Sequence, residues 1–202
     1  MSAMRLGMLY LRSRSAGRAG VFFVAIAAAA WLWLWLRWDS TSAITITSVP
    51  IVVPLAAAMV VGASAGSPFG ESEATASRPL WPLRGGHLIL LVAIAAVALA
   101  LAVLRWSAHD SAWTLVRNLA GFTGLTLLAV RVLGSGLSWA LPLGYAILSS
   151  LALRPGEQPS PWAWPALAAT DRAAAVIAIG LLLAGLAAVA LFSRPDRAGE
   201  EA

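Results

Sequence analysis

The chain contains no cysteine and no lysine, and these absences limit the covalent bonds, metal sites and charged groups that it can form. Without cysteine it forms no disulfide, performs no thiol chemistry and binds no metal through thiolates. Its two histidines, His87 and His109, lie far apart in sequence, so their spacing predicts no metal site. All 14 basic residues are arginines spread over loops and helix ends, and the net charge of +5 therefore indicates anchoring at anionic lipid headgroups. We expect no metal, no cofactor and no nucleic-acid partner.

Charge of either sign is also scarce. Only 11% of the residues are charged and 60% are hydrophobic, whereas about 25% of a soluble domain is charged. This composition indicates an integral membrane protein. The length suffices for about six helices of about 20 residues with short connections, which leaves no room for a separate soluble domain.

The apolar runs predict an all-α, polytopic membrane domain over residues 19–193, between a basic amphipathic segment at 1–18 and a tail at 194–202. Nine arginines fall on the side of the N-terminus and five on the other, so both termini are expected in the cytoplasm of a bacterial cell, with the chain crossing its plasma membrane several times. The predicted spans are about 19–36, 43–62, 87–104, 113–133, 137–153 and 172–192.

Arginines and tryptophans mark the places where this chain would meet the membrane surface. The arginines of residues 1–18 alternate with apolar residues, as in a helix that lies in the interface. The tryptophans of residues 31–35 alternate as in a strand, but a lone strand leaves its backbone unpaired in lipid, so we expect a helix with an outer aromatic belt. A stacking platform for an aromatic or sugar ligand is the alternative. Two further tryptophans in the proline-rich loop 154–171 are expected to dip into the outer headgroups. The predicted anchors are Arg5, Arg12, Arg14, Trp31, Trp33, Trp35, Trp162 and Trp164.

The predicted span 113–133 is the most polar one. Its residues Arg117, Gly121, Gly124 and Arg131 share one helical stripe, and Asn118 adjoins it. Glycines let another helix approach closely. Two interpretations stay open: the arginines extend to the interface as anchors, or Arg117 and Asn118 face a cavity and contact a substrate or a partner subunit.

A second candidate for lining a path is the predicted span 43–62, which contains Pro50 and Pro54 and several hydroxyl groups. Proline removes a helical hydrogen bond and bends the helix. The span either lines a path or packs as a bent helix.

Signatures of catalysis are missing. There is no Gly-x-x-x-x-Gly-Lys-Ser/Thr, no His-Glu-x-x-His, and no pair of carboxylates within a span. We therefore expect that the chain is not an enzyme by itself. A small membrane enzyme using Arg117, Asn118 and His109 around a lipid phosphate is a weak alternative, because no general base is positioned beside them.

The longest polar interruption, residues 63–86, contains Glu71 and Glu73 between two prolines. A basic amphipathic N-terminal segment, six spans with both ends inside and this acidic loop together resemble the membrane subunit of a type-2 ABC exporter. The run Ser67-Pro68-Phe69-Gly70-Glu71 is similar to that of small actinobacterial membrane proteins described as ABC permeases. The resemblance implies a coupling helix in this loop that docks on a separate ATPase through Phe69, Glu71 and Glu73. The chain departs from the family in its short length and its proline-rich loop before the sixth span.

The expected function is thus that of a permease subunit, which forms a homodimer or pairs with a sibling permease in the lipid bilayer and binds a separate ATP-binding subunit through residues 63–86. A membrane scaffold or accessory subunit with no transport of its own is the alternative. Both functions use the same loop as a docking surface, so the sequence does not separate them.

Overall fold

The computed structural model describes residues 21–26, 28–29, 32, 43–65, 81–103, 109–151 and 160–191. This part of the chain is helical and contains no strand, which confirms the all-α prediction. The longer helices are α3 (Ala43–Ala65), α5 (Trp81–Val103), α6 (His109–Leu133) and α8 (Arg172–Leu191); the shorter ones are α7 (Ala140–Leu151) and the 3-10 helix η1 (Trp164–Ala166).

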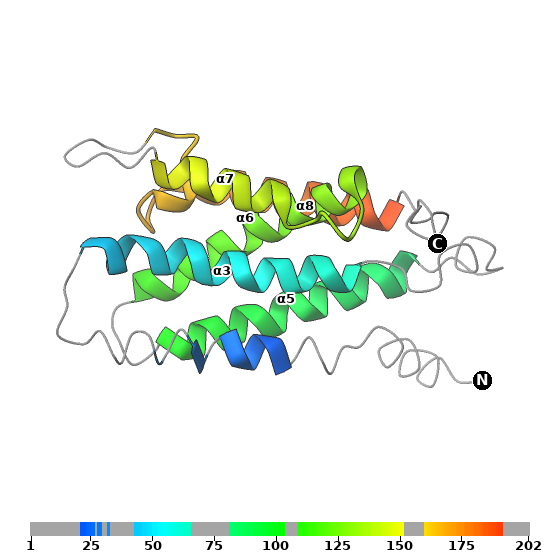
Figure 1. Cartoon of the computed structure of the whole chain (residues 1–202), viewed down its shortest axis with the longest axis horizontal. Coiled ribbons are helices and arrows are strands. Elements are labelled where there is room, and N and C mark those ends of the chain that lie inside the picture. The colour runs from blue at the N-terminus through cyan, green and yellow to red at the C-terminus, as the bar shows by residue number, and fades with distance from the viewer. Residues whose placement is uncertain are drawn as a thin grey trace.

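Consecutive helices run in alternating directions (Figure 1). The helices α3, α6 and α8 run from left to right in this view, and α5 and α7 return from right to left. The turn between α6 and α7 therefore lies at the right-hand end with the end of α3 and the start of α5, while η1 and the start of α8 lie at the left-hand end. This up-and-down order matches the order of the predicted spans.

The helix α6 is the centre of the bundle. It packs against α3, α5, α7 and α8. In its most apolar stretch 61% of the residues are buried, against 33% for α5 and 22% for α8. The least apolar of the three, α6, is thus enclosed, whereas the more apolar α5 and α8 keep most of their side chains on the surface.

The crossing of α6 and α8 is unusually close because a glycine on each helix lies at the contact. A Cβ atom added to Gly185 would lie 2.6 Å from the carbonyl oxygen of Gly124. A Cβ atom on Gly124 would overlap the backbone of Leu181. Glycine at both positions permits backbone-to-backbone packing, as in membrane helix pairs with small residues at the interface.

The start of α8 is fixed by Asp171. The backbone N–H of Ala174 donates to Asp171 Oδ1 at 2.8 Å, and the N–H of Ala175 donates to the Asp171 carbonyl at 3.3 Å. A side-chain acceptor at the N-cap satisfies a donor that the helix leaves unpaired.

The helix α7 begins at Ala140, three residues after the start of the predicted span 137–153. Residues 134–139 form a turn instead, stabilised by the bond that Ser138 Oγ donates to the Ser135 carbonyl at 2.9 Å.

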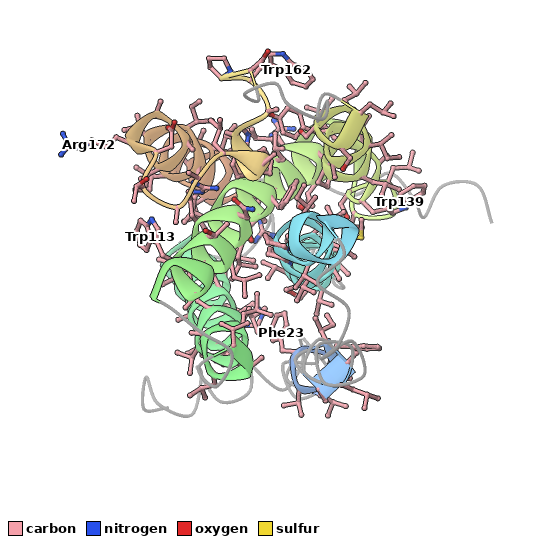
Figure 2. The ribbon with its side chains drawn as sticks, turned by 90° about the vertical axis from the view of Figure 1, so that its left-hand side faces the viewer. Phe23, Trp113, Trp139, Trp162 and Arg172 are labelled. Carbon is pink, nitrogen blue, oxygen red and sulfur yellow. The ribbon has the colours of Figure 1, made fainter. Side chains whose placement is uncertain are left out.

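The described part of the first predicted span, residues 21–26 and 28–29, is helical and lies beside the bundle (Figure 2). Phe23 points toward the other helices and is buried, whereas Val21, Phe22 and Val24 are exposed. One apolar side chain of this segment therefore joins the core, and its neighbours remain on the surface.

Gly124→Ala tests the close crossing of α6 and α8. We expect it to lower stability by about 1–3 kcal/mol, because the obstructing atoms are backbone and the helices must separate. The measurement is the thermal midpoint of the detergent-purified chain. Gly180→Ala on α8 is the matched control, since a Cβ there meets nothing within 4 Å. Equal midpoints for the two variants would contradict the close crossing.

Candidate functional site

The strongest concentration of buried polar groups lies in the first half of α6. Arg117 is 3% exposed and Asn118 is 0% exposed. The guanidinium donates to the carbonyl oxygens of Ala168 (2.7 Å), Leu167 (2.9 Å) and Trp164 (3.3 Å), and its Nε donates to Asn118 Oδ1 at 3.2 Å. We call Arg117 and Asn118 the polar node; it binds the segment 164–168 to α6 through that segment's backbone.

Asn118 also joins α3 to this segment. Its Nδ2 donates to the carbonyl oxygen of Pro50 at 2.7 Å and to that of Pro165 at 2.8 Å. In a helix the carbonyl of Pro50 would accept the N–H of residue 54, but Pro54 has none. Asn118 therefore supplies the hydrogen bond that Pro54 removes from α3.

Beneath the polar node the indole of Trp164 fills an aromatic slot formed by Gly121, Phe122 and Tyr145. The Phe122 and Trp164 ring centroids lie 5.4 Å apart at 49°, and the Tyr145 and Trp164 centroids lie 6.1 Å apart at 21°. A Cβ atom on Gly121 would overlap the indole ring, so only glycine leaves room for it. Tyr145 also donates its hydroxyl proton to the carbonyl of Trp162, which ties the residues just before the segment 164–168 to α7.

The structure unites some predicted site residues and separates others. Pro50, Arg117, Asn118 and Gly121 meet at the polar node and the slot. Gly124 lies one turn further along α6, at the crossing with α8. Arg131 lies in the last turn of α6, toward the opposite end of the bundle.

One predicted anchor is corrected by the structure. Trp164 is 2% exposed and belongs to the core, so its indole does not lie among headgroups. The reason is the space left by the missing side chain of Gly121, together with the four backbone carbonyls of the segment 164–168 that the polar node binds. Trp162 is half exposed and points away from the bundle (Figure 2), and its place at a membrane surface stays a prediction.

Arg117 does not extend to the interface as an anchor. Its guanidinium is enclosed by the segment 164–168, and of the two interpretations only the inward orientation agrees with its burial. Asp171 at the start of α8 lies close enough to act favourably on this charge. The contacts of Arg117 and Asn118 are made within the chain.

The remaining predicted site residues lie outside the described part of the chain. They are the docking residues Phe69, Glu71 and Glu73 and the anchors Arg5, Arg12, Arg14, Trp31, Trp33 and Trp35. The side chain of His109, proposed for the alternative enzyme, also lies outside it.

The polar node is suited to holding backbone, not to catalysis. Arginine has no acceptor and stays protonated, and an amide does not act as a general base. Over the ranges that the structure describes, no three histidine, aspartate or glutamate residues gather to hold a metal ion. The arrangement therefore positions a peptide segment inside the bundle.

Sequence reasoning missed the role of Pro54, Phe122 and Tyr145. The signal for Pro54 was present, because a second proline four residues after Pro50 leaves the Pro50 carbonyl without its helical donor. No local pattern points to Phe122 or Tyr145, since each is an ordinary aromatic residue in an apolar run.

Comparisons of this chain with family models, curated proteins and solved structures found no match.

Arg117→Lys tests the polar node. Lysine keeps the charge but cannot span three carbonyls and an amide, so we expect a loss of about 2–4 kcal/mol and faster cleavage of the segment 160–171 by elastase. The measurements are the thermal midpoint and the cleavage rate. Arg172→Lys is the matched control, because Arg172 is exposed and points away from the bundle (Figure 2). If both variants resist elastase like the unaltered chain, the node does not hold the segment.

Proposed function

We propose that this chain is a multi-pass protein of a bacterial plasma membrane that serves as a membrane-embedded accessory or scaffold subunit of a larger complex. The observation that carries the proposal is the distribution of polar groups: Arg117, Asn118 and Thr126 of α6 are buried and bonded within the chain, and the long helices around it expose apolar side chains.

The membrane part of the proposal rests on length and surface. Among the residues that the structure describes, three helical stretches are long and apolar enough to cross a bilayer: Arg84–Val103, Ala112–Leu133 and Arg172–Val189. Twenty helical residues extend about 30 Å, the thickness of a typical hydrocarbon core. The exposed flank of α5 carries Ile89, Ile94, Val97 and Leu101, and that of α8 carries Val176, Ile179 and Leu183. Contiguous apolar surface of this extent indicates contact with lipid or with another protein.

The accessory role rests on what the inward polar groups do. A path for a polar solute needs hydrogen-bonding or charged side chains along its wall. Arg117 and Asn118, the first candidates for such a wall, bind the backbone of residues 50 and 164–168 instead. Gly121 and Gly124 are covered by Trp164 and α8. This use of the polar residues supports a structural role for the bundle.

The permease subunit of a type-2 ABC exporter is the second candidate. It is favoured by a different observation, the acidic residues Glu71 and Glu73 between α3 and α5 together with the basic N-terminal segment. Of the predicted loop 63–86, residues 63–65 and 81–86 are helical. Its path would lie between two copies of the chain or between the chain and a sibling permease, and ATP hydrolysis would take place in a separate subunit.

Membrane insertion is tested by alkaline carbonate extraction of bacterial membranes. We expect the chain to stay in the pellet, because apolar helices of this length are held by the bilayer core rather than by surface charge. Leu183→Arg, on the exposed flank of α8, is expected to reduce the inserted fraction severalfold, whereas Ala202→Arg in the tail leaves it unchanged. Complete release of the unaltered chain by carbonate would overturn the proposed location.

The two candidate roles are separated by purifying the tagged chain in mild detergent with its native partners. For an accessory subunit we expect a membrane-protein partner and no stoichiometric ATPase. An ATPase that is lost with Glu71→Arg and Glu73→Arg, but kept with Glu200→Arg and Glu201→Arg as the equal change of charge in the tail, would replace the accessory role by the permease.

A further inference from the structure

The polar node and the aromatic slot have the properties of a peptide-binding site. We propose that Arg117, Asn118 and the slot of Gly121, Phe122 and Tyr145 form a binding site for a peptide segment bearing an aromatic side chain, and that the chain's own residues 164–168 occupy it as an exchangeable intramolecular ligand.

The first argument is that the site recognises backbone. The bonds from Arg117 and Asn118 to this segment end on the carbonyl oxygens of Trp164, Pro165, Leu167 and Ala168. Every residue carries a carbonyl, so these bonds fix the path of the segment without depending on its side chains. A planar guanidinium beside a planar amide presents donors in fixed directions, which suits several carbonyls of one tight turn.

The second argument is that a single side chain of the segment is recognised, by shape. Trp164 is among the largest fully buried side chains of the described chain. Its ring lies nearly parallel to that of Tyr145 and tilted to that of Phe122, and both arrangements are favourable for aromatic pairs. The absence of a Cβ on Gly121 leaves the space that the indole occupies.

The third argument is that the site belongs to the bundle and not to the segment. Arg117 and Gly121 are four residues apart on α6, so the helix itself places the donors above the slot. Phe122 is on the same helix, and Tyr145 is supplied by α7. The segment contributes only a three-residue 3-10 turn and the residues beside it. Site and occupant are therefore separable parts, as in a receptor with a tethered ligand.

The test is to remove the indole and return it as a free molecule. Trp164→Gly in the full-length, detergent-purified chain leaves an indole-sized vacancy lined by aromatic rings, and apolar cavities of this kind bind small aromatic molecules. We expect added indole at saturation to raise the thermal midpoint of Trp164→Gly by roughly 5 °C. The unaltered chain is expected to show no shift, because its slot is filled.

Trp162→Gly is the matched control, because it removes a tryptophan only two residues before Trp164 and the side chain of Trp162 is half exposed. Indole is expected to leave its midpoint unchanged. The acetylated and amidated peptide Ala-Trp-Pro-Ala-Leu-Ala, which copies residues 163–168, is then expected to stabilise Trp164→Gly and to compete with indole. Equal indole shifts in all three chains would mean non-specific partition and overturn the proposal, as would no shift in Trp164→Gly.

A second variant covers the case in which Trp164→Gly is not recovered from membranes. Trp164→Leu keeps an apolar side chain and leaves a smaller vacancy. If the slot is a preformed site, indole supplied during expression restores the yield of Trp164→Gly at least severalfold and that of Trp164→Leu less. A yield of both variants that does not respond to indole shows that the slot collapses without its own tryptophan, which contradicts the proposal.

Discussion

The described structure depends on two side chains of α6 that donate hydrogen bonds to backbone carbonyls. The segment 164–168 brings four such carbonyls to Arg117 and Asn118, and Pro54 leaves a fifth, that of Pro50, without its helical donor. Two of the four also accept a backbone N–H, Trp164 from Leu167 and Ala168 from Asp171. A buried carbonyl without a donor costs about 1–3 kcal/mol, and water is scarce in an apolar surrounding. Two adjacent side chains of α6, Arg117 and Asn118, meet this requirement. Without Arg117 and Asn118 the segment 164–168 would lose these side-chain hydrogen bonds to α6.

The choice of residue types follows from this requirement. Arginine has five N–H donors in a rigid planar group and no acceptor, so it can donate to several carbonyls and needs no hydrogen-bond donor itself. Asparagine adds two donors and also offers an oxygen, which accepts the Nε–H of Arg117 and holds the planar group in place. Burying the charge is unfavourable by itself, and the oriented carbonyl dipoles and the nearby carboxylate of Asp171 offset this. The presence of Arg117 and Asn118 on α6 is therefore explained by the fold before any ligand is considered.

The fold was largely predictable from the sequence and the site was predictable only in part. Apolar runs separated by arginines locate the long helices, and the stripe of Arg117, Gly121 and Gly124 marks α6 as the helix with the most contacts. Burial of Trp164 was not predictable, because a tryptophan after prolines fits an interfacial loop equally well and its slot is made by Tyr145 from another helix. The late start of α7 was missed for a similar reason: Leu137 and Trp139 are apolar, and only the turn geometry excludes residues 137–139 from the helix.

The two ends of the bundle differ in a way that bears on where a partner binds. At the end with η1, the helices α3, α6, α7 and α8 are joined through the polar node, the slot and the cap at Asp171, so this end is closed by contacts within the chain. At the other end lie the end of α3 and the start of α5, which border the loop that carries Glu71 and Glu73, and the last turn of α6 with Arg131. Both candidate functions require a docking surface. The proposed docking at Glu71 and Glu73 would thus lie beside the end of α3 and the start of α5, away from the polar node, and the described flanks of the long helices are apolar.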